Sequence, residues 1–411
     1  MRILHTADWH IGIELNGCSL EADFDLFIHW LVNTCIPEHN PDVLLVSGDI
    51  FDKANPAAKA RTQYYNTLGK LKNTSLKHII LTGGNHDHPL TLDAPAPLLK
   101  ELDIHIIGGV TDDKNHMLIP LPNAQNPEVL IAAIPFLRDT DIRRSKAGEG
   151  SEAREESVRQ GITDFYLDIA SRTQTWKHKG VPVLVAGHVF ATGASTSDSE
   201  RLIQVGNLGG VDATTFPEAD FDYVALGHIH KPQDVGGSDR IRYSGSPIAL
   251  SFSERQQQKR ILLVQNNGDT LNSQSIPIPL FRKLVRIEGD WKHIQKEVKQ
   301  LPEQQPLPAW LELRIQEPEF DPAMAGIISS WIEKISAERQ DIRILQHRYE
   351  VAFQKNNEHT LLHQSKNLAE LKPIEVLDAL MIKRGVSDDK KKSLINTFIQ
   401  LMELADQPEA L

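Results

Sequence analysis

The sequence has only two cysteines, Cys18 and Cys35, among 411 residues. Two thiols are too few for a disulfide framework or a thiolate metal site, and they indicate a reducing compartment. The sequence also lacks an apolar run of the roughly 18 residues needed to span a bilayer, and the residues after Met1 show no signal-peptide pattern. We therefore expect a cytoplasmic protein without a membrane contact.

An excess of positive charge is also absent, because 55 acidic residues outnumber 44 basic ones and give a formal net charge of -11. This counts against general electrostatic attraction to a nucleic-acid backbone, so any such contact needs a local basic surface. One candidate is a short charged stretch, although such a stretch is more often a solvated loop. Its basic residues are Arg138, Arg143, Arg144 and Lys146.

From Met1 to residue 279, short β-branched apolar runs alternate with longer helical patterns, which predicts an α/β core. The predicted strands are Arg2–Thr6, Asp42–Ser47, His78–Thr82, Val129–Ile134, Val181–Ala186 and Asp222–Leu226. The predicted helices are Glu21–Thr34, Ala57–Lys72 and Ser151–Lys177. Three later strand signals predict antiparallel pairing at one side, and they are Arg240–Ser244, Arg260–Gln265 and Leu271–Ile276.

Pro277 and Pro279 mark the start of a second unit, for which we expect a βαβαβ module over residues 280–350. Its predicted elements are strand Lys283–Glu288, helix Trp291–Gln300, strand Trp310–Gln316, helix Pro322–Ala337 and strand Asp341–Gln346. Residues 351–371 are polar and weakly periodic, which is typical of a linker. Residues 372–411 predict two short amphipathic helices, which either dock another protein or pack back on their own chain.

Five short polar segments each follow directly after a predicted strand. They are Asp8-Trp9-His10, Gly48-Asp49, Gly84-Asn85-His86-Asp87, Gly187-His188 and Gly227-His228-Ile229-His230. Most of these segments are weak signals by themselves. All five, however, would lie at the carboxyl ends of strands, where open α/β sheets bind ligands, and their glycines permit sharp turns. We therefore expect their side chains to gather at one point.

The side chains expected at that point are carboxylates, imidazoles and one amide, a set that suits Mn, Fe or Zn. The predicted ligands are Asp8, His10, Asp49, Asn85, His188, His228 and His230. Seven ligands are too many for one ion, but two ions about 3.5–4 Å apart would use them all by sharing Asp49 as a bridge. Two divalent ions and two carboxylates leave a positive pocket, which favours binding and hydrolysis of a phosphate ester.

Two further residues beside these ligands are candidates for the catalytic step. His86 adjoins a predicted ligand but is not needed as one, so it can contact the phosphoryl oxygen or protonate the leaving alkoxide. Asp52 can hydrogen-bond His86 and orient it, or it can simply cap a helix N-terminus. The remaining histidines lack the strand-end position, and we expect them to be structural or solvated.

With its five segments in this order, the sequence resembles the calcineurin-like metallophosphoesterases. The resemblance implies a four-layer α/β/β/α fold. It also implies two metal sites that share one carboxylate. One ion would be held by Asp8, His10, Asp49 and His230, and the other by Asp49, Asn85, His188 and His228.

More specifically, the chain is similar over nearly its full length to the nuclease subunits of double-strand-break repair complexes. The likeness is carried by Ile3–Gly12, Ala186–His188, Ala225–His230 and Tyr243–Pro247. It implies manganese-dependent exonuclease and hairpin endonuclease activity on DNA, in repair and recombination. Residues 280–350 would then be a capping domain that presents DNA, residues 372–411 would grip a partner ATPase, and two nuclease subunits would pair through core helices. The sequence has no Gly-x-x-x-x-Gly-Lys-Ser/Thr loop, so ATP dependence would come from that partner.

Two other functions stay open at this point. A nucleotide phosphodiesterase of the same superfamily would use the same ligands but would leave the C-terminal modules without a role. A catalytically idle scaffold that anchors an ATPase to DNA ends is disfavoured by the presence of all seven ligands. A phosphoprotein phosphatase is also disfavoured, because Lys53 stands where that class usually has Arg, and Asp87 stands where it has Glu.

Overall fold

The structure is a computed structural model, and it describes residues 1–143, 150–196, 210–266, 271–303, 306–319 and 321–351, together with residues 381, 391, 394, 395, 397 and 398. The chain divides into two compact units, Met1–Val351 and Ala352–Leu411. The predicted helix pair over 372–411 lies outside the described residues, apart from those few positions. So do the predicted linker beyond Val351 and two of the basic residues, Arg144 and Lys146.

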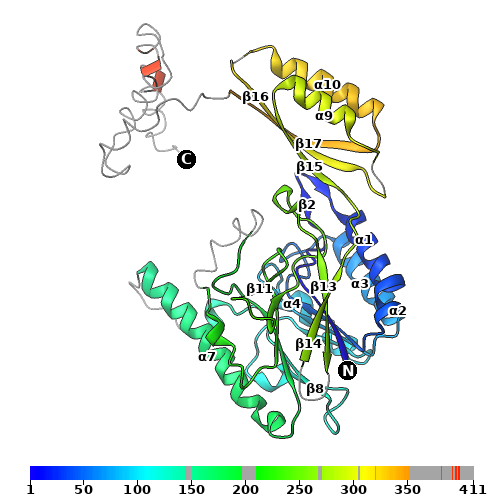
Figure 1. The fold of residues 1–411 in the computed structure, drawn as a ribbon. Coiled ribbons are helices and arrows are strands. Elements are labelled where there is room, and N and C mark those ends of the chain that lie inside the picture. The colour runs from blue at the N-terminus through cyan, green and yellow to red at the C-terminus, as the bar shows by residue number, and fades with distance from the viewer. Residues whose placement is uncertain are drawn as a thin grey trace. The chain divides into compact units, whose positions relative to one another are not determined.

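In the described part of the first unit, two six-stranded sheets form the centre of the core (Figure 1). The first has the order β14-β13-β1-β4-β5-β6, with β1, β4, β5 and β6 parallel. The second has the order β11-β12-β10-β9-β8-β7, with β8, β9, β10 and β12 parallel. The strands of the first sheet are β1 Arg2–Thr6, β4 Val43–Ser47, β5 His78–Thr82, β6 Ile104–Ile107, β13 Arg260–Asn266 and β14 Leu271–Pro277. Those of the second are β7 Leu118–Leu121, β8 Val129–Ala133, β9 Val183–His188, β10 Tyr223–Gly227, β11 Gln233–Asp234 and β12 Ile241–Tyr243.

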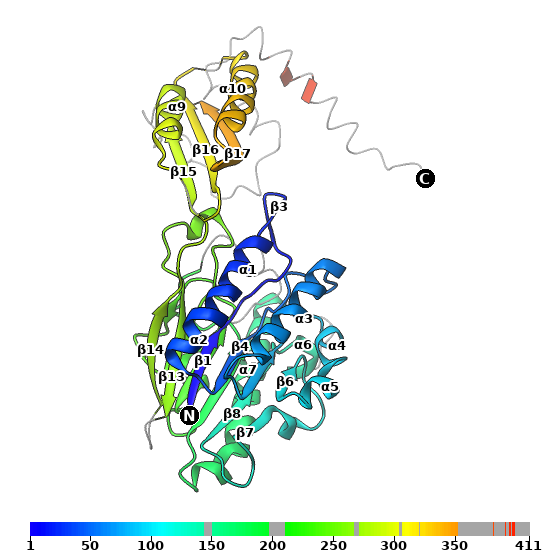
Figure 2. The same ribbon diagram turned by 90° about the vertical axis from the view of Figure 1, so that its right-hand side faces the viewer.

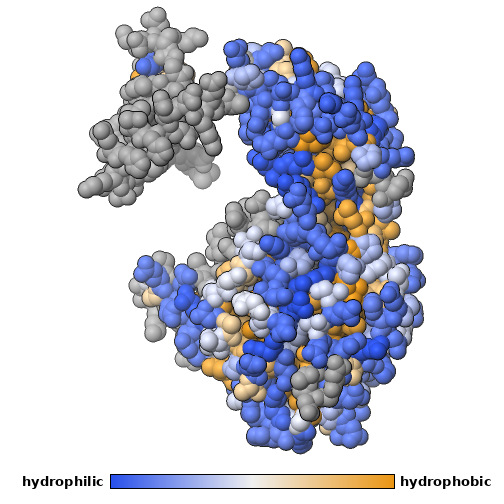
Figure 3. All heavy atoms as spheres, viewed as in Figure 1, coloured by the Kyte–Doolittle hydropathy of each residue, from blue (hydrophilic) through white to orange (hydrophobic). Residues whose placement is uncertain are grey.

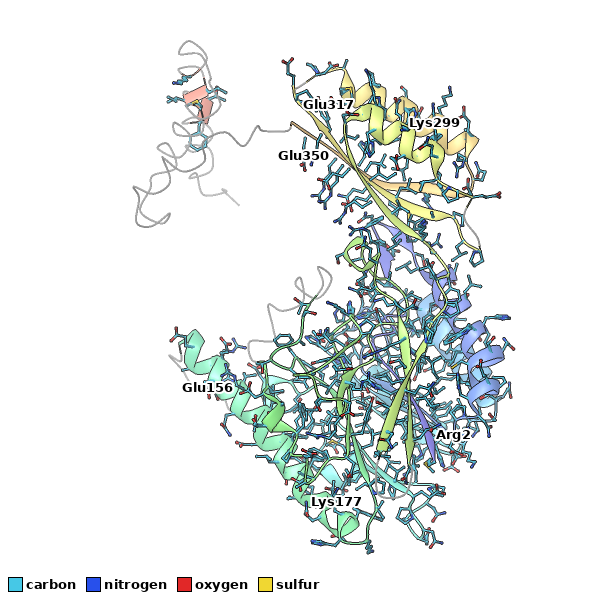
Figure 4. All side chains as sticks on the ribbon, in the orientation of Figure 1. Arg2, Glu156, Lys177, Lys299, Glu317 and Glu350 are labelled. Atoms are coloured by element: carbon cyan, nitrogen blue, oxygen red, sulfur yellow. The ribbon has the colours of Figure 1, made fainter. Side chains whose placement is uncertain are left out.

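Helices cover the outer face of each sheet, with α1, α2 and α3 on one side and α7 on the other (Figures 1 and 2). The helices of the core are α1 Glu21–Trp30, α2 Ile36–His39, α3 Ala58–Lys72, α4 Pro89–Asp93, α5 Ala96–Lys100, α6 Asp139–Ile142 and α7 Ser151–Lys177. Glu156 and Lys177 mark the two end regions of α7 in Figure 4. Among the helices described, none has both the length and the apolar character required to traverse a bilayer.

The central strands are apolar on both faces because each sheet is packed on two sides. Ile3 and Val43 cluster with the second sheet and α7, whereas their neighbours Leu4 and Leu44 cluster with α1 and α3. Adjacent residues of a strand point to opposite faces, so this alternation defines two core layers. The resulting order is helix, sheet, sheet, helix, as the family resemblance implied.

Several local predictions differ from the structure. Strand β12 pairs in parallel with β10, so the antiparallel prediction for Arg240–Ser244 is wrong on that side; it is antiparallel only to the short strand β11. The helix predicted over Glu21–Thr34 is interrupted after Trp30 by a π-helical segment, Leu31–Cys35, which continues into α2. Strands β6 and β7 were not predicted, because four-residue apolar runs resemble buried helix segments.

A three-stranded parallel sheet with two helices follows the core, which confirms the predicted βαβαβ order. Its elements are β15 Leu284–Gly289, α9 Trp291–Gln300, β16 Ala309–Glu317, α10 Met324–Glu338 and β17 Ile342–Val351. Strand β17 runs beyond its predicted end at Gln346 to Val351. The helices pack on one sheet face around a separate apolar cluster that includes Leu311, Ile294 and Ile328. We call these elements the cap module.

A buried ion pair joins the cap module to the core. The Arg282 guanidinium donates to both carboxylate oxygens of Asp23 on α1, with N–O distances of 2.8–3.0 Å. The same guanidinium lies 4.0 Å above the Trp310 ring of β16. Arginine suits this position because its planar group forms paired hydrogen bonds and stacks on an aromatic ring at the same time. Figure 3 shows apolar side chains gathered between the cap module and the core on this face of the molecule.

Candidate metal centre

The five polar segments of the sequence meet where the two sheets face each other. Strands β1, β4 and β5 contribute Asp8, Asp49 and Asn85 from the first sheet, and β9 and β10 contribute His188 and His228 from the second. The backbone amide of His228 donates to Asp8 Oδ1 at 2.8 Å, although these residues are 220 positions apart. His188 Nδ1 lies 3.0 Å from the carbonyl oxygen of Ser47 at the end of β4. Two sheet edges therefore build one pocket.

Four of the pocket residues have backbone torsion angles that residues other than glycine rarely adopt. The φ angles are 53° at Asp8, 44° at His10, 50° at Asp49 and 99° at His228. A positive φ costs free energy for a residue with a Cβ atom, and it persists where the surrounding structure enforces it. Strain gathered at one place is typical of a functional site.

Glycines allow the segments to approach so closely. A Cβ atom on Gly48 would lie 2.1 Å from His188 Nδ1, and one on Gly84 would lie 2.1 Å from Asp49 Oδ1. At Gly227 the same atom would lie 1.8 Å from the carbonyl oxygen of Ser47. These distances are far shorter than any non-bonded contact, so no other residue fits these positions without a backbone shift.

One group of donor atoms lies around His10. The Nε2 atoms of His10 and His230 are 3.1 Å apart, and Asp49 Oδ2 is 3.5 Å from His10 Nε2. Asp8, His10 and His230 each offer one atom within 4.8 Å of the others. These are the residues that the family resemblance assigned to the first ion.

A second group of donor atoms lies around Asn85. Its Oδ1 atom is 2.9 Å from His188 Nε2 and 3.0 Å from His228 Nδ1. Asp49 Oδ2 is 3.3 Å from His188 Nε2, so the same carboxylate oxygen borders both groups. A carboxylate in this position suits a bridge between two ions.

The residues present fit divalent cations. Asp8 Oδ2 is buried and lacks a hydrogen-bond partner in the described part of the chain. A buried polar atom without a partner costs about 1–3 kcal/mol, and a bound cation would remove that cost for ligand atoms. Oxygen and imidazole donors without thiolate match Mn, Fe or Zn.

The buried carboxylates and imidazoles of the pocket shift each other's pKa values. Burial favours the neutral acid, but the rings of His188 and His10 hold the pKa of Asp49 well below its usual range. Burial alone would lower the pKa of His188, but the charges of Asp49 and Asp8 overcome this effect and raise that pKa to about 9. Buried carboxylates close to imidazoles thus stabilise a cationic group in the pocket.

His86 lies at the edge of the pocket, but Asp52 contacts it differently from the prediction. The atom 2.7 Å from His86 Nδ1 is the backbone carbonyl oxygen of Asp52 and not its carboxylate. The Asp52 carboxylate instead lies 3.6 Å from His10 Nδ1. A carbonyl only accepts, so His86 Nδ1 donates to it and Nε2 is left to face the pocket.

Asp87 and Glu254 are two buried acids that the sequence reasoning did not assign. Asp87 accepts hydrogen bonds from the backbone amides of Gly84, Ile50 and Phe51 and so ties together the loops after β5 and β4. Glu254 lies behind His230, with Oε1 3.7 Å from Nδ1 of that ring. Asp87 was visible as part of an unusual motif, whereas a lone Glu in a serine-rich turn gave no pattern.

The basic stretch proposed to contact nucleic acid has local partners where it is described. The Arg138 guanidinium donates to the carbonyl oxygen of Asp87 at 3.0 Å, which places it beside the pocket. The Arg143 side chain is only 6% exposed and forms an ion pair with Asp139. Arg138 thus lies beside the pocket, and Arg143 pairs with a residue of α6.

Comparisons with known proteins agree with this pocket. Residues 1–232 match the family described as calcineurin-like phosphoesterase. A curated relative from Escherichia coli K12, named as the SbcD component of the nuclease SbcCD, is 31% identical over 417 aligned residues that cover all of both chains. The chain belongs to the calcineurin-like phosphoesterases, within the SbcD family.

Two other members of the SbcD family extend the likeness. The protein from Rhodobacter capsulatus is 36% identical over 68% of this chain and 69% of its own length. The one from Bacillus subtilis is 32% identical over 77% of this chain and 79% of its own length. Residues 280–384 also match the family described as type 5 capsule protein repressor C-terminal domain. The calcineurin-like phosphoesterase family is one of metal-dependent hydrolases, so the chain is a hydrolase of phosphate esters.

Proposed function

We propose that this chain is the nuclease subunit of a DNA repair complex and hydrolyses phosphodiester bonds with two divalent cations, Mn²⁺ being the best fit. The observation that carries the proposal is the convergence of seven donor side chains from facing edges of two sheets. One ion would be held by Asp8, His10, Asp49 and His230, and the other by Asp49, Asn85, His188 and His228. When bound, such ions stabilise charge on phosphoryl oxygens and lower the pKa of water to about 7.

The chain's own residues would orient the substrate and move a proton. His86 Nε2 is buried at the pocket edge, and the Asp52 carbonyl fixes the ring through Nδ1. This leaves Nε2 to contact a phosphoryl oxygen or to give a proton to the leaving alkoxide. The Asp52 carboxylate would act on His10, whose Nδ1 it faces, and not on His86 as the sequence suggested.

A nuclease assay with the full-length chain tests this proposal. End-labelled hairpin and linear duplex DNA should be cleaved in Mn²⁺ with an SbcC-type ATPase and ATP, and a chelator should stop the reaction. Cleavage of small phosphodiesters without any cleavage of DNA would favour the nucleotide phosphodiesterase. DNA-end binding without cleavage of either substrate would favour the scaffold.

The face of the cap module sheet that lies away from its helices is a second proposed DNA contact. Leu311, Leu313 and Ile315 pack with the helices, so the intervening residues of β16 point to the other face. The register places Arg314 beside Arg348 on that face. Arg286 and Arg314 both form ion pairs with Glu312, and Arg343 and Arg348 are exposed. This supplies the local basic surface that an acidic chain needs in order to hold a phosphate backbone.

The double substitution Arg314→Ala and Arg348→Ala should weaken DNA binding equally for all sequences. Each lost phosphate contact removes about one unit from the slope of log affinity against log salt, so the slope should fall by about two. Fluorescence anisotropy over a range of salt concentrations measures this slope. Lys292→Ala with Lys299→Ala is the matched control, because both residues lie on α9 over the other sheet face (Figure 4). An unchanged slope in the arginine variant would remove this face from the proposal.

Two protein partners complete the proposal. Residues 372–411 would dock an SbcC-type ATPase in the cytoplasm, and a second copy of the chain would pair through the core helices. Apolar side chains are unusually exposed along α3–α5 and the turn that follows, namely Tyr65 (46%), Leu90 (73%), Leu98 (72%) and Leu102 (46%). Light scattering should give twice the monomer mass, and Leu90→Glu with Leu98→Glu should give the monomer.

A further inference from the structure

A buried ion pair between Glu254 and Lys259 lies behind the pocket. Glu254 ends the 3-10 turn Phe252–Glu254, and Lys259 directly precedes β13. Their side chains are 0% and 7% exposed, and Lys259 Nζ is 2.6 Å from Glu254 Oε2. A desolvated pair of this kind generally stabilises a fold no better than apolar residues of the same volume. Stability of the fold therefore does not explain why this pair lies beside a candidate metal ligand.

The pair and its neighbour Ser246 hold His230 through both its backbone and its ring. Lys259 Nζ donates to the His230 carbonyl oxygen at 2.9 Å, and the Ser246 amide donates to the same oxygen at 3.2 Å. Glu254 Oε1 is 3.7 Å from His230 Nδ1, while Nε2 across the ring is 3.1 Å from His10 Nε2. The ring is thus held from behind and turned with Nε2 toward the pocket.

The carboxylate itself is held in place by other donors. The Leu250 amide donates to Glu254 Oε2 at 3.2 Å, and the Ser251 hydroxyl donates to Oε1 at 3.1 Å. With Lys259 also bound to Oε2, both oxygens have fixed partners. Glu254 therefore presents a fixed acceptor to the His230 ring.

Two other pocket histidines also have an oxygen behind the ring. His188 Nδ1 lies 3.0 Å from the Ser47 carbonyl oxygen, which is a hydrogen-bond distance, whereas His10 Nδ1 lies 3.6 Å from the Asp52 carboxylate and has no hydrogen bond among the described residues. In each case an oxygen stands behind the ring and Nε2 faces the pocket. An acceptor in this position holds the proton on Nδ1 and leaves a lone pair on Nε2 for a cation.

We propose that Glu254 is a positioning residue that sets the orientation and tautomer of His230, with Lys259 balancing the charge of the carboxylate. The inference rests on the proposed metal-dependent function and adds one residue to it. It predicts that the affinity for the ion bound through His230 depends on Glu254, although Glu254 is not a ligand of that ion.

Calorimetric titration of the full-length chain with Mn²⁺ tests this inference. Glu254→Met should weaken binding of one of the two ions roughly 10- to 100-fold, because supporting hydrogen bonds contribute about that much to metal affinity. Glu254→Gln keeps an acceptor oxygen and should lose clearly less affinity than Glu254→Met. Binding of the second ion should be unchanged in both variants.

Asp23→Asn is the matched control, because it also breaks a buried ion pair but does so at the joint to the cap module. It should leave both Mn²⁺ affinities unchanged, even if the thermal midpoint falls. If Glu254→Met does not fold, the double variant with Lys259→Met leaves no unpaired buried charge and serves for the same titration. Wild-type affinities in the Glu254→Met chain, with only a lower thermal midpoint, would overturn the proposal. If the wild-type chain binds no Mn²⁺, the proposed function fails instead.

Discussion

Replacing Asp49 by Asn is expected to abolish DNA cleavage, with a fall in kcat of at least about a thousandfold, or roughly 4 kcal/mol of transition-state stabilisation. Asp49 Oδ2 is the atom that borders both donor groups, at 3.5 Å from His10 Nε2 and 3.3 Å from His188 Nε2. An amide oxygen carries no charge and bridges two cations poorly. Mn²⁺ titration should therefore show weaker binding of both ions, and end-labelled hairpin DNA should stay intact.

Asp42→Asn is the matched control for that substitution. Asp42 directly precedes β4, whose other end leads to Asp49, and it pairs with Lys77 and the amide of Arg2 away from the pocket. It should keep wild-type kcat. If Asp49→Asn lost only one ion, Asp49 would belong to a single site and the shared-carboxylate arrangement would be wrong.

Replacing His86 by Ala should lower kcat on DNA by about 10²- to 10⁴-fold, the usual contribution of a general acid. Unlike Asp49→Asn, this variant should bind both Mn²⁺ ions with wild-type affinity. The fall in kcat should also be smaller on a phosphodiester with a nitrophenolate leaving group, because that group departs without protonation. Steady-state rates on the two substrates, set beside a metal titration, provide the measurement.

His88→Ala controls for the loss of a nearby imidazole, since His88 is exposed at the start of α4, only two residues away. The structure also allows a competing result, because a His86 nitrogen lies within 4.8 Å of donor atoms of His10 and Asp49. Loss of one ion in His86→Ala would make His86 a ligand. An equal defect on both substrates would exclude it as the acid for the leaving group.

Predictions from the sequence were most accurate for long or strongly patterned elements. Helices α7 and α9 have the predicted bounds, Ser151–Lys177 and Trp291–Gln300, because charged, proline-free stretches of that length have few alternatives. The pairing of β12 was predicted wrongly, since a three-residue strand carries no information about its neighbour. The short strands β6 and β7 were missed for a similar reason, because so few apolar residues show no period.

The candidate site was also predicted only in part from the sequence. The seven proposed ligands and His86 could be selected from the sequence, because each follows a strand and belongs to a residue type that binds metals or moves protons. Asp52 does contact His86, but the sequence could not show that the contact is made by its backbone carbonyl, because the direction of its carboxylate depends on side-chain torsions. Glu254 and Lys259 were not found, because neither lies at the end of a strand.

The sequence by itself determined which residue types stand at the ends of five strands, and with them the class of chemistry that this protein performs. Only the tertiary structure decided that three of these ends belong to one sheet and two to another, and that the two edges face each other. The reason is physical. A strand pattern defines which side chains share a face, but contacts such as that from His228 to Asp8 join segments 220 residues apart and depend on how whole sheets pack.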